Sequence, residues 1–360
     1  MSDELVDRHL AEVRDADAFD VAAVHAWLRD EVAGLPDDPP EVRQFTGGAS
    51  NLTYLLRYPD RELILRRPPV GAKPASGHDV LREARIQELL QPAFPYVPAV
   101  VATAEAHPVL GSDVAVTERL HGTILRSRIP SALDLDAAAA RHLSEQLVDR
   151  WVELHDVDPL ATGLASFGRG PGYVERQITG WSQRYRAART RNVPSFERVM
   201  AWLEAHRPDD VGSCVVHGDW RFDNLVLAPD DPSRIVGVLD WELATVGDPL
   251  MDLGASLAYW VQADDGRAFR MLRRQPTDAP GMLTRDEVVA RYLAATGRSV
   301  APDGWRFYEV YGLFRLAVII EQIHARDVVS ASRNPAFRWF WLGVHVLHRR
   351  CLRLIRQAGR

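Results

Sequence analysis

The sequence predicts an α+β protein with two lobes, in which a small sheet-rich lobe with one sheet helix precedes a larger, mostly helical lobe. Three observations predict this fold. A chain of 360 residues is long for a single core. Apolar stretches of strand length are concentrated before residue 121, and after residue 131 apolar residues recur at the three- and four-residue spacing of helices. The expected lobes are residues 1–118 and 119–360.

The first lobe is expected to hold an N-terminal helix, a five-stranded antiparallel sheet and one helix on that sheet. An amphipathic pattern predicts the first helix over 19–32. Gly34 and Pro36, which follow the pattern, indicate where this helix ends. A second helical pattern covers 79–90, after a loop rich in Gly, Pro and Ser. The five strands are predicted at 41–45, 52–58, 62–67, 97–104 and 114–120.

The second lobe is predicted to be helical, with one β-rich insert. Helical spacing covers 133–154, 173–191 and 196–206. A compact β-rich segment then spans 214–242, and helices continue to the carboxyl end.

Composition excludes several classes of protein. Lys+Arg total 43 and Asp+Glu 49, a net charge of −6, which argues against a nucleic-acid partner. No apolar run approaches the roughly 18 residues of a membrane span, and the charged amino terminus is no signal peptide. Cys214 and Cys351 are too few for a disulfide framework or a cysteine zinc site. We therefore expect a soluble, cytoplasmic protein without a membrane partner.

Clustered polar residues follow two apolar strands of the β-rich segment. Asp219 and Asn224 flank a tight loop, and Asp240 closes the next strand. Asn224 and Asp240 offer a neutral and a charged oxygen, a pair that suits Mg²⁺. Asp219 could accept a proton from a substrate hydroxyl. Asp219 alone would be explained as a turn cap, and Asp240 alone as the end of a strand. The complete set of polar residues at this spacing is much harder to obtain by chance.

This set, H-G-D-x4-N followed by an apolar strand ending in D-x-E, resembles the aminoglycoside phosphotransferase-like, choline kinase-like branch of the protein-kinase fold. The resemblance implies a bilobal fold that binds ATP and Mg²⁺, with Asp219 as the catalytic aspartate. It makes Asn224 and Asp240 the metal ligands. In this family Asp252 braces the catalytic loop, while Asp248 is expected to cap a helix and His217 to orient the loop by hydrogen bonding.

The resemblance also implies a nucleotide site in the first lobe. A loop between two strands would cover the phosphates, although Gly-Gly there is also typical of a plain hairpin. This loop contributes Gly48, Ala49, Ser50 and Asn51. The usual phosphate-binding lysine is replaced by Arg66, with Arg67 as the alternative, and Arg66 is expected to pair with Glu83. Lys73, the single lysine of the chain, lies in a loop unsuited to that role. The backbone at Glu118 and Leu120 would meet the adenine edge.

The acceptor is expected to be anionic rather than polycationic. Residues 306–360 contain ten arginines against three acidic residues, although a solvated helix face would explain many of them. The stretches HGDWRFDN at 217–224 and FRLAVIIEQIHAR at 314–326 resemble stand-alone kinases similar to the kinase-like domain fused to some acyl-CoA dehydrogenases. That likeness implies a hydroxyacyl compound or its CoA thioester. Candidate contacts are Arg221, Arg315 and Arg326.

The prediction is therefore an ATP-dependent phosphotransferase that moves the γ-phosphate to a hydroxyl of a small molecule. Two alternatives stay open. One is an aminoglycoside O-phosphotransferase, and the other is a nucleotide-binding pseudokinase, suggested by the absent lysine.

Overall fold

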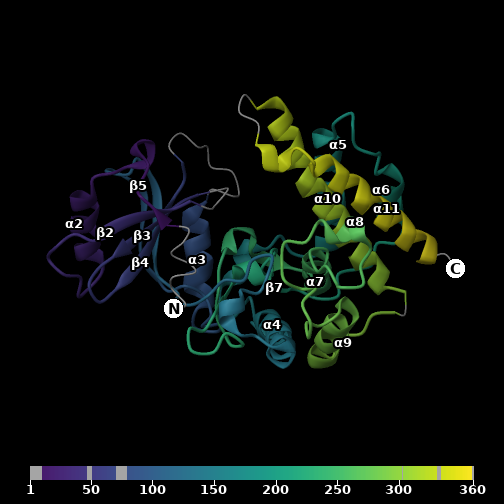
Figure 1. Cartoon of the computed structure of the whole chain (residues 1–360), viewed down its shortest axis with the longest axis horizontal. Coiled ribbons are helices and arrows are strands. Elements are labelled where there is room, and N and C mark those ends of the chain that lie inside the picture. Colours follow the sequence, from purple (N-terminus) through teal and green to yellow (C-terminus); the bar gives the residue numbers. More distant parts are fainter. Residues whose placement is uncertain (1–9, 47–50, 70–78, 302, 331–333, 359–360) are drawn as a thin grey trace. The chain divides into compact units, whose positions relative to one another are not determined.

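The computed structural model describes residues 10–46, 51–69, 79–301, 303–330 and 334–358, and the chain forms two units (Figure 1). Unit 1 comprises residues 1–124, 160–164 and 224–244. Unit 2 comprises residues 125–159, 165–223 and 245–360. The chain thus returns to unit 1 after residue 223, whereas the lobe boundary expected at 118/119 stays a prediction.

Unit 1 is built on a six-stranded antiparallel sheet with the order β1-β2-β3-β4-β6-β5. Its strands are β1 Leu10–Ala11, β2 Glu41–Phe45, β3 Leu52–Arg57, β4 Glu62–Arg67, β5 Val100–His107 and β6 Ser112–Glu118. The expected number of five strands was wrong, because two-residue β1 is too short to show an alternating pattern. It pairs with the end of β2. The two expected helices are α2 Val21–Glu31 and α3 Val80–Leu90.

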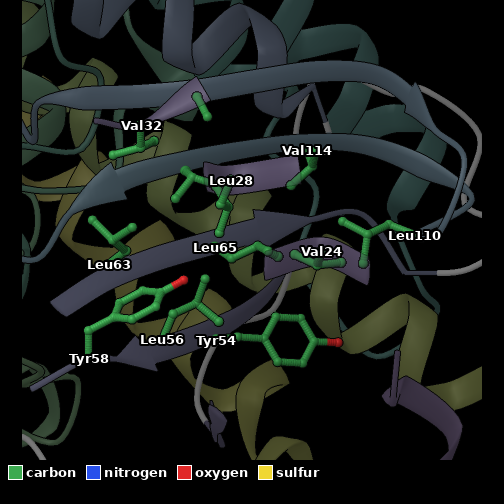
Figure 2. Packing of buried hydrophobic residues seen from close by; sticks show 12 residues of the cluster. Val24, Leu28, Val32, Tyr54, Leu56, Tyr58, Leu63, Leu65, Leu110 and Val114 are labelled. Atoms are coloured by element: carbon green, nitrogen blue, oxygen red, sulfur yellow. The ribbon is translucent and has the colours of Figure 1, made fainter. Parts of the chain in front are cut away.

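The two faces of β4 carry different side chains because successive residues of a strand point to opposite sides. Leu63 and Leu65 are buried in a core with Val24 and Leu28 of α2 (Figure 2). Arg66 has the opposite parity and faces the side covered by α3. The alternation of β4 therefore sets which arginine can reach α3.

The β-rich segment predicted at 214–242 contains three short strands, and together with a fourth strand just after residue 242 they form two separate sheets. In unit 1, β8 Leu225–Leu227 pairs with β9 Ile235–Val238. In unit 2, β7 Cys214–Val216 pairs with β10 Thr245–Gly247. Candidate site residues follow the ends of β7 and β9.

Unit 2 is otherwise helical, and α10 and α11 lie side by side in it (Figure 1). Its α-helices are α4 Ala137–Asp156, α5 Tyr173–Ala188, α6 Glu197–Ala205, α7 Pro249–Leu257, α8 Arg267–Arg270, α9 Arg285–Thr296, α10 Trp305–Val329 and α11 Phe340–Ala358. The 3-10 turns of the chain are η1 Asp15–Asp17, η2 Ser131–Leu133, η3 Leu164–Phe167, η4 Phe222–Asn224, η5 Trp241–Leu243 and η6 Pro335–Phe337. No helix of the described residues is long and apolar enough to cross a membrane.

Two glycines let α7 and α10 cross with their backbones in close contact. A β-carbon at Gly312 would lie 1.9 Å from the carbonyl oxygen of Gly254, and one at Gly254 would lie 2.5 Å from that of Tyr308. Any larger residue would force the helices apart. This close crossing fixes the positions of Asp252 on α7 and Arg315 on α10.

Asp265 ties α9 and α11 together in unit 2. Arg285 Nη1 donates to Asp265 Oδ2 at 2.7 Å, and Arg350 Nη1 donates to Oδ1 at 2.6 Å. Burial by itself would raise the pKa of Asp265, but the two arginines outweigh it and lower the pKa from 3.8 to about 2. The carboxylate therefore stabilises the fold only while it is ionised.

We expect Asp265 to contribute to loss of stability in acid. A carboxylate with a lowered pKa contributes stability above its unfolded value of 3.8, and that contribution disappears as the pH falls toward 2. Asp265→Asn should lower the free energy of unfolding near neutral pH by about 1–2 kcal/mol. Urea unfolding near pH 7 and at about pH 3 measures this. The variant should lose less stability on acidification than the wild type, and an identical pH dependence would contradict the assignment.

Candidate active site

Loop 217–224 begins where β7 ends and is held from two helices. Gly218 has a φ of +80°, a conformation that glycine adopts without strain. Its amide donates to Asp252 Oδ1 at 2.9 Å, and the amide of His217 donates to Oδ2 at 3.3 Å. Arg315 Nη2 donates to the carbonyl oxygen of Gly218 at 2.8 Å. The loop is thus fixed from α7 and α10.

The Asp219 carboxylate is oriented by its neighbours on this loop. Arg221 Nη2 donates to Asp219 Oδ2 at 2.8 Å and lies 3.2 Å from Asp223 Oδ2. The amide of Asp219 donates to Nδ1 of buried His217 at 3.2 Å, the orienting role expected for that residue. The Arg221 guanidinium also lies over the Tyr259 ring, 4.6 Å from its centroid. The side chain of Asp219 is 16% exposed, so it is not fully enclosed by the protein.

Charge on the loop is balanced around Arg221. Burial lowers the pKa of Arg221, but the carboxylates of Asp219 and Asp223 outweigh it and raise the pKa. Burial raises the pKa of Asp223, and Arg221 opposes that rise. Arg221 therefore stays protonated and holds both carboxylates.

Asp252 braces the loop from the interior of unit 2, as expected from the resemblance. Trp151 Nε1 donates to its Oδ2 at 3.1 Å, and His155 Nε2 lies 3.3 Å from the same oxygen. Burial would raise the pKa of Asp252, but hydrogen bonds from His155 and Trp151 help to lower it. Asp248 caps α7, since its Oδ1 accepts from Leu250 at 2.9 Å.

Asn224 and Asp240 lie at the same end of the β8–β9 hairpin in unit 1. The amide of Leu239 donates to the carbonyl oxygen of Asn224 at 2.8 Å, which places Asn224 opposite the residue before Asp240. Asp240 has φ 68° and ψ 63°, a left-handed conformation that costs a non-glycine residue about 1–2 kcal/mol. Backbone strain of this kind is concentrated at functional sites.

The amide oxygen of Asn224 and the carboxylate of Asp240 are donors of the kind that suits a magnesium ion. The Asp240 carboxylate has no hydrogen-bond or ion-pair partner among the described residues. Mg²⁺ is commonly held by one or two carboxylates together with substrate phosphates, rather than by an all-protein cage. The described residues contain no group of three His, Cys, Asp or Glu side chains that could hold a metal.

Arg66 and Glu83 form an ion pair beside Asp240 in unit 1. Burial lowers the pKa of Arg66, but Glu83, Asp240 and Glu242 together raise it. Burial also raises the pKa of Glu83, against the effect of Arg66. Arg66 thus lies among three carboxylates.

Arg67, the alternative to Arg66, lies on the other face of β4. It is 2% exposed, and its Nη2 donates to the carbonyl oxygen of Asp17 at 2.7 Å and to the Tyr54 hydroxyl at 3.0 Å. Arg82 of α3 holds the chain after Asp240, because its Nη2 donates to the carbonyl oxygen of Ala244 at 2.6 Å.

Of the other residues predicted to bind the nucleotide, the structure describes Asn51, Glu118 and Leu120. Gly48, Ala49 and Ser50 lie outside the described residues. Asn51 is buried just before β3. The Glu118 carboxylate pairs with Arg61, and its amide donates to the carbonyl oxygen of Ala99 at 2.8 Å. Leu120 packs closely on Gly237: a β-carbon added at Gly237 would lie 2.3 Å from the Leu120 side chain.

Of the predicted substrate arginines, Arg221 belongs to loop 217–224 and Arg315 contacts it. Arg326 is exposed on α10 and donates to the carbonyl oxygen of Gln322. It lies eleven residues after Arg315, or about 16 Å along the helix at 1.5 Å per residue. The structure therefore does not bring Arg326 to the loop.

Several residues of the site have no sequence signal strong enough to find them. Tyr259 lies under Arg221, and Gln275 Oε1 accepts from the amide of Phe222 at 2.8 Å. Trp181 lies 5.2 Å from Arg315, measured from the ring centroid to Cζ. Each comes from a segment distant in sequence, and only tertiary packing brings it to the loop.

The sheet-rich unit with its Arg66–Glu83 pair and the helical unit with its braced loop define a protein of the protein-kinase-like fold, as predicted. The sequence model of the Phosphotransferase enzyme family (APH) matches residues 41–309. The chain belongs to this family.

Its curated relatives are larger proteins. Acyl-CoA dehydrogenase family member 10 from Mus musculus is 34% identical over 324 residues, which cover 89% of this chain and 30% of the relative. Acyl-CoA dehydrogenase family member 11 from Homo sapiens is 29% identical over 332 residues, 90% of this chain and 42% of the relative. The chain thus spans less than half of these relatives, and the expected likeness to their kinase-like domain is confirmed.

Solved structures show the same fold. A crystal structure of a candidate aminoglycoside phosphotransferase from Ralstonia eutropha has a TM-score of 0.80 at 28% identity and covers 94% of this chain and 99% of its own. Choline kinase from Cryptosporidium parvum has a TM-score of 0.56 at 13% identity, with coverages of 94% and 96%. The second likeness concerns the fold alone.

Proposed function

We propose that this protein transfers the γ-phosphate of ATP to a hydroxyl group of a small molecule in the cytoplasm. Membership in the phosphotransferase family supports transfer to small molecules in general. The observation that carries the proposal is the Asp219 carboxylate, oriented by Arg221 on a loop that buried Asp252 braces. A pseudokinase scaffold would not need this arrangement.

Each residue has a distinct role in the proposed reaction. Asp219 accepts the proton of the acceptor hydroxyl, and Arg221 fixes the direction of its carboxylate. Asn224 and Asp240 would hold Mg²⁺, which neutralises charge on the phosphates when bound. Arg66, positioned by Glu83, would contact the phosphates with its planar guanidinium. Catalysis by these groups depends on position and charge rather than on a covalent intermediate.

The nucleotide would be held by the first unit. The backbone of Gly48, Ala49, Ser50 and Asn51 would cover the phosphates, and the backbone of Glu118 and Leu120 would meet the adenine. The amides of Glu118 and Arg119 already donate to Ala99 and Glu62, at 2.8 and 3.1 Å. The donor to the base would therefore be the amide of Leu120.

We propose an anionic hydroxyacyl compound, free or as a CoA thioester, as the acceptor. The curated relatives are acyl-CoA dehydrogenase family members, so a hydroxyacyl substrate would suit a domain found beside such an enzyme. Arg221 and Arg315 place positive charge beside Asp219. Arg326, by its distance from Arg315, would meet at most a remote part of the acceptor.

The second candidate is an aminoglycoside acceptor, favoured by the likeness to the Ralstonia eutropha structure. An aminoglycoside is a polycation and would need a site lined by carboxylates. The carboxylates of Asp219 and Asp223 are already engaged by Arg221, and Arg315 adds a further positive charge. This charge favours the hydroxyacyl acceptor.

Incubation with Mg²⁺-ATP and a panel of acceptors tests the proposal. The panel should contain hydroxy acids, their CoA thioesters, sugars and aminoglycosides, with mass spectrometry to detect the transferred phosphate. We expect phosphorylated hydroxyacyl products. A phosphorylated aminoglycoside as the main product would support the second candidate, and ATP binding without any phosphorylated product would support the pseudokinase.

Replacement of Arg66 is expected to weaken nucleotide binding. Arg66→Gln removes a charge-assisted contact, which is worth about 1.5–3 kcal/mol, so the KM for ATP should rise roughly tenfold or more. Arg66→Lys should bind ATP more tightly than Arg66→Gln but more weakly than the wild type, because lysine keeps the charge but not the planar guanidinium group. Arg85→Gln, a change at an exposed position of α3, is the control. An unchanged KM for ATP in Arg66→Gln would exclude the phosphate role.

A further inference from the structure

Helices α5 and α10 present a group of polar and aromatic side chains to each other. Gln177, Trp181 and Arg184 are spaced by four and three residues and share one face of α5. Tyr311 and Arg315 are one turn apart on α10. Trp181 Nε1 donates to Gln177 Oε1 at 2.9 Å, and the Tyr311 hydroxyl donates to the same oxygen at 3.3 Å. We call these five residues the α5–α10 cluster.

Two arginines of the α5–α10 cluster share one indole ring. Arg184 Cζ lies 4.6 Å and Arg315 Cζ 5.2 Å from the ring centroid of Trp181. Such contacts stabilise a cation only modestly. Two guanidinium groups, both charged at any accessible pH, are therefore gathered at one ring.

Neither arginine of the α5–α10 cluster is held in an ion pair among the described residues, although the Asp219 carboxylate acts on Arg315 electrostatically. Arg315 is only 6% exposed, and its hydrogen bond goes to the neutral carbonyl oxygen of Gly218. Buried charges are normally paired, because an unpaired one loses its hydration without compensation. Buried Arg315 and exposed Arg184 thus offer two positive charges at one ring to an anionic ligand.

The α5–α10 cluster adjoins loop 217–224 within the same unit. Arg315 contacts both the Trp181 ring and Gly218, the residue before Asp219. A ligand on the cluster would therefore extend from the carboxylate that is proposed to activate the acceptor hydroxyl. This position suits the distal part of an acceptor.

We propose that the α5–α10 cluster binds the phosphate-bearing tail of the acceptor, such as that of a CoA thioester. The inference deepens the proposed function and rests on it. A simple carboxylate brings one negative charge, whereas a phosphate ester or a diphosphate can match two guanidiniums. Planar guanidinium groups also suit phosphate oxygens geometrically. Half-buried Trp181 offers a flat surface for the organic part of the tail.

Replacement of Arg184 tests this subsite kinetically. Arg184 is exposed and has no ion pair to lose, so Arg184→Gln should fold normally. The KM for a hydroxyacyl-CoA acceptor should rise about tenfold, with most of the loss in KM rather than in kcat, because one charge-assisted contact is removed. Arg189→Gln, an exposed change at the end of the same helix, is the matched control and should behave as wild type. An equal KM in Arg184→Gln and wild type would overturn the proposal.

A binding measurement separates this inference from the proposed reaction. Calorimetric titration with CoA, with the nucleotide site saturated by Mg²⁺ and a non-hydrolysable ATP analogue, needs no turnover. The Kd should be about tenfold higher for Arg184→Gln than for wild type or Arg189→Gln. Pyrophosphate should compete with CoA, whereas acetate should not.

The outcomes point to different failures. Loss of CoA affinity in Arg184→Gln without any phosphorylated product would keep the subsite and reject phosphotransfer. Phosphorylated products with equal CoA affinity in all three proteins would reject the subsite alone. No CoA binding to the wild type would also reject the subsite.

Discussion

Asp219→Asn is expected to lower kcat by about 10²–10⁴-fold while ATP still binds, because a positioned general base contributes a factor of that size. Asparagine keeps the shape of the side chain but cannot accept the hydroxyl proton. Arg221 would lose one charged partner and keep Asp223. Steady-state kinetics with the best acceptor of the panel measures kcat, and calorimetry with ATP measures nucleotide binding.

The matched control is Asp230→Asn, an equal change at an exposed position on the β8–β9 connection. It should leave kcat at the wild-type value. Full activity in Asp219→Asn would show that another group takes the proton, and the assignment of loop 217–224 as catalytic would then be wrong.

Asp240→Asn is expected to weaken Mg²⁺ binding by at least about 100-fold, since even loss of an outer-shell partner costs 10- to 100-fold. Asparagine tolerates the left-handed backbone of residue 240, so the fold should persist. A titration of activity with Mg²⁺ at fixed ATP should move to much higher metal concentration. Binding of ATP in the presence of EDTA should change little.

Glu242→Gln is the control that distinguishes coordination of Mg²⁺ by Asp240 from a general effect of negative charge near Arg66. Glu242 and Asp240 both act electrostatically on Arg66, but only Asp240 is proposed as a ligand. Glu242→Gln should therefore keep the wild-type Mg²⁺ dependence. Equal effects of the two substitutions would mean that charge near Arg66, rather than coordination by Asp240, explains the loss.

The sequence predicted the architecture because its periodic signals are local. The helix expected at 79–90 is α3, and the strand expected at 62–67 is β4 with the same limits. The two-residue strand β1 was missed, since it depends on pairing with β2. The β-rich segment was found, but its division between two sheets depends on long-range pairing of β7 with β10.

The part of the candidate site that lies within one sequence motif was predictable from the sequence. Asp219, Asn224 and Asp240 lie within 22 residues of each other, so a single pattern shows them. Whether Arg66 or Arg67 meets Glu83 is decided by the face of β4 on which each lies. The partners of Arg315, Trp181 on α5 and Gly218 on the loop, are more than 90 residues away, and no local pattern links them.

The most direct test is mass-spectrometric detection of phosphate transfer from Mg²⁺-ATP to a hydroxyacyl acceptor, with the wild type and Asp219→Asn compared side by side. The wild type should add one phosphate group at the acceptor hydroxyl, and Asp219→Asn should add almost none although it binds ATP. Equal product from both proteins, or ATP binding by the wild type without transfer to any hydroxyl compound, would contradict the assignment of this protein as a phosphotransferase that uses Asp219.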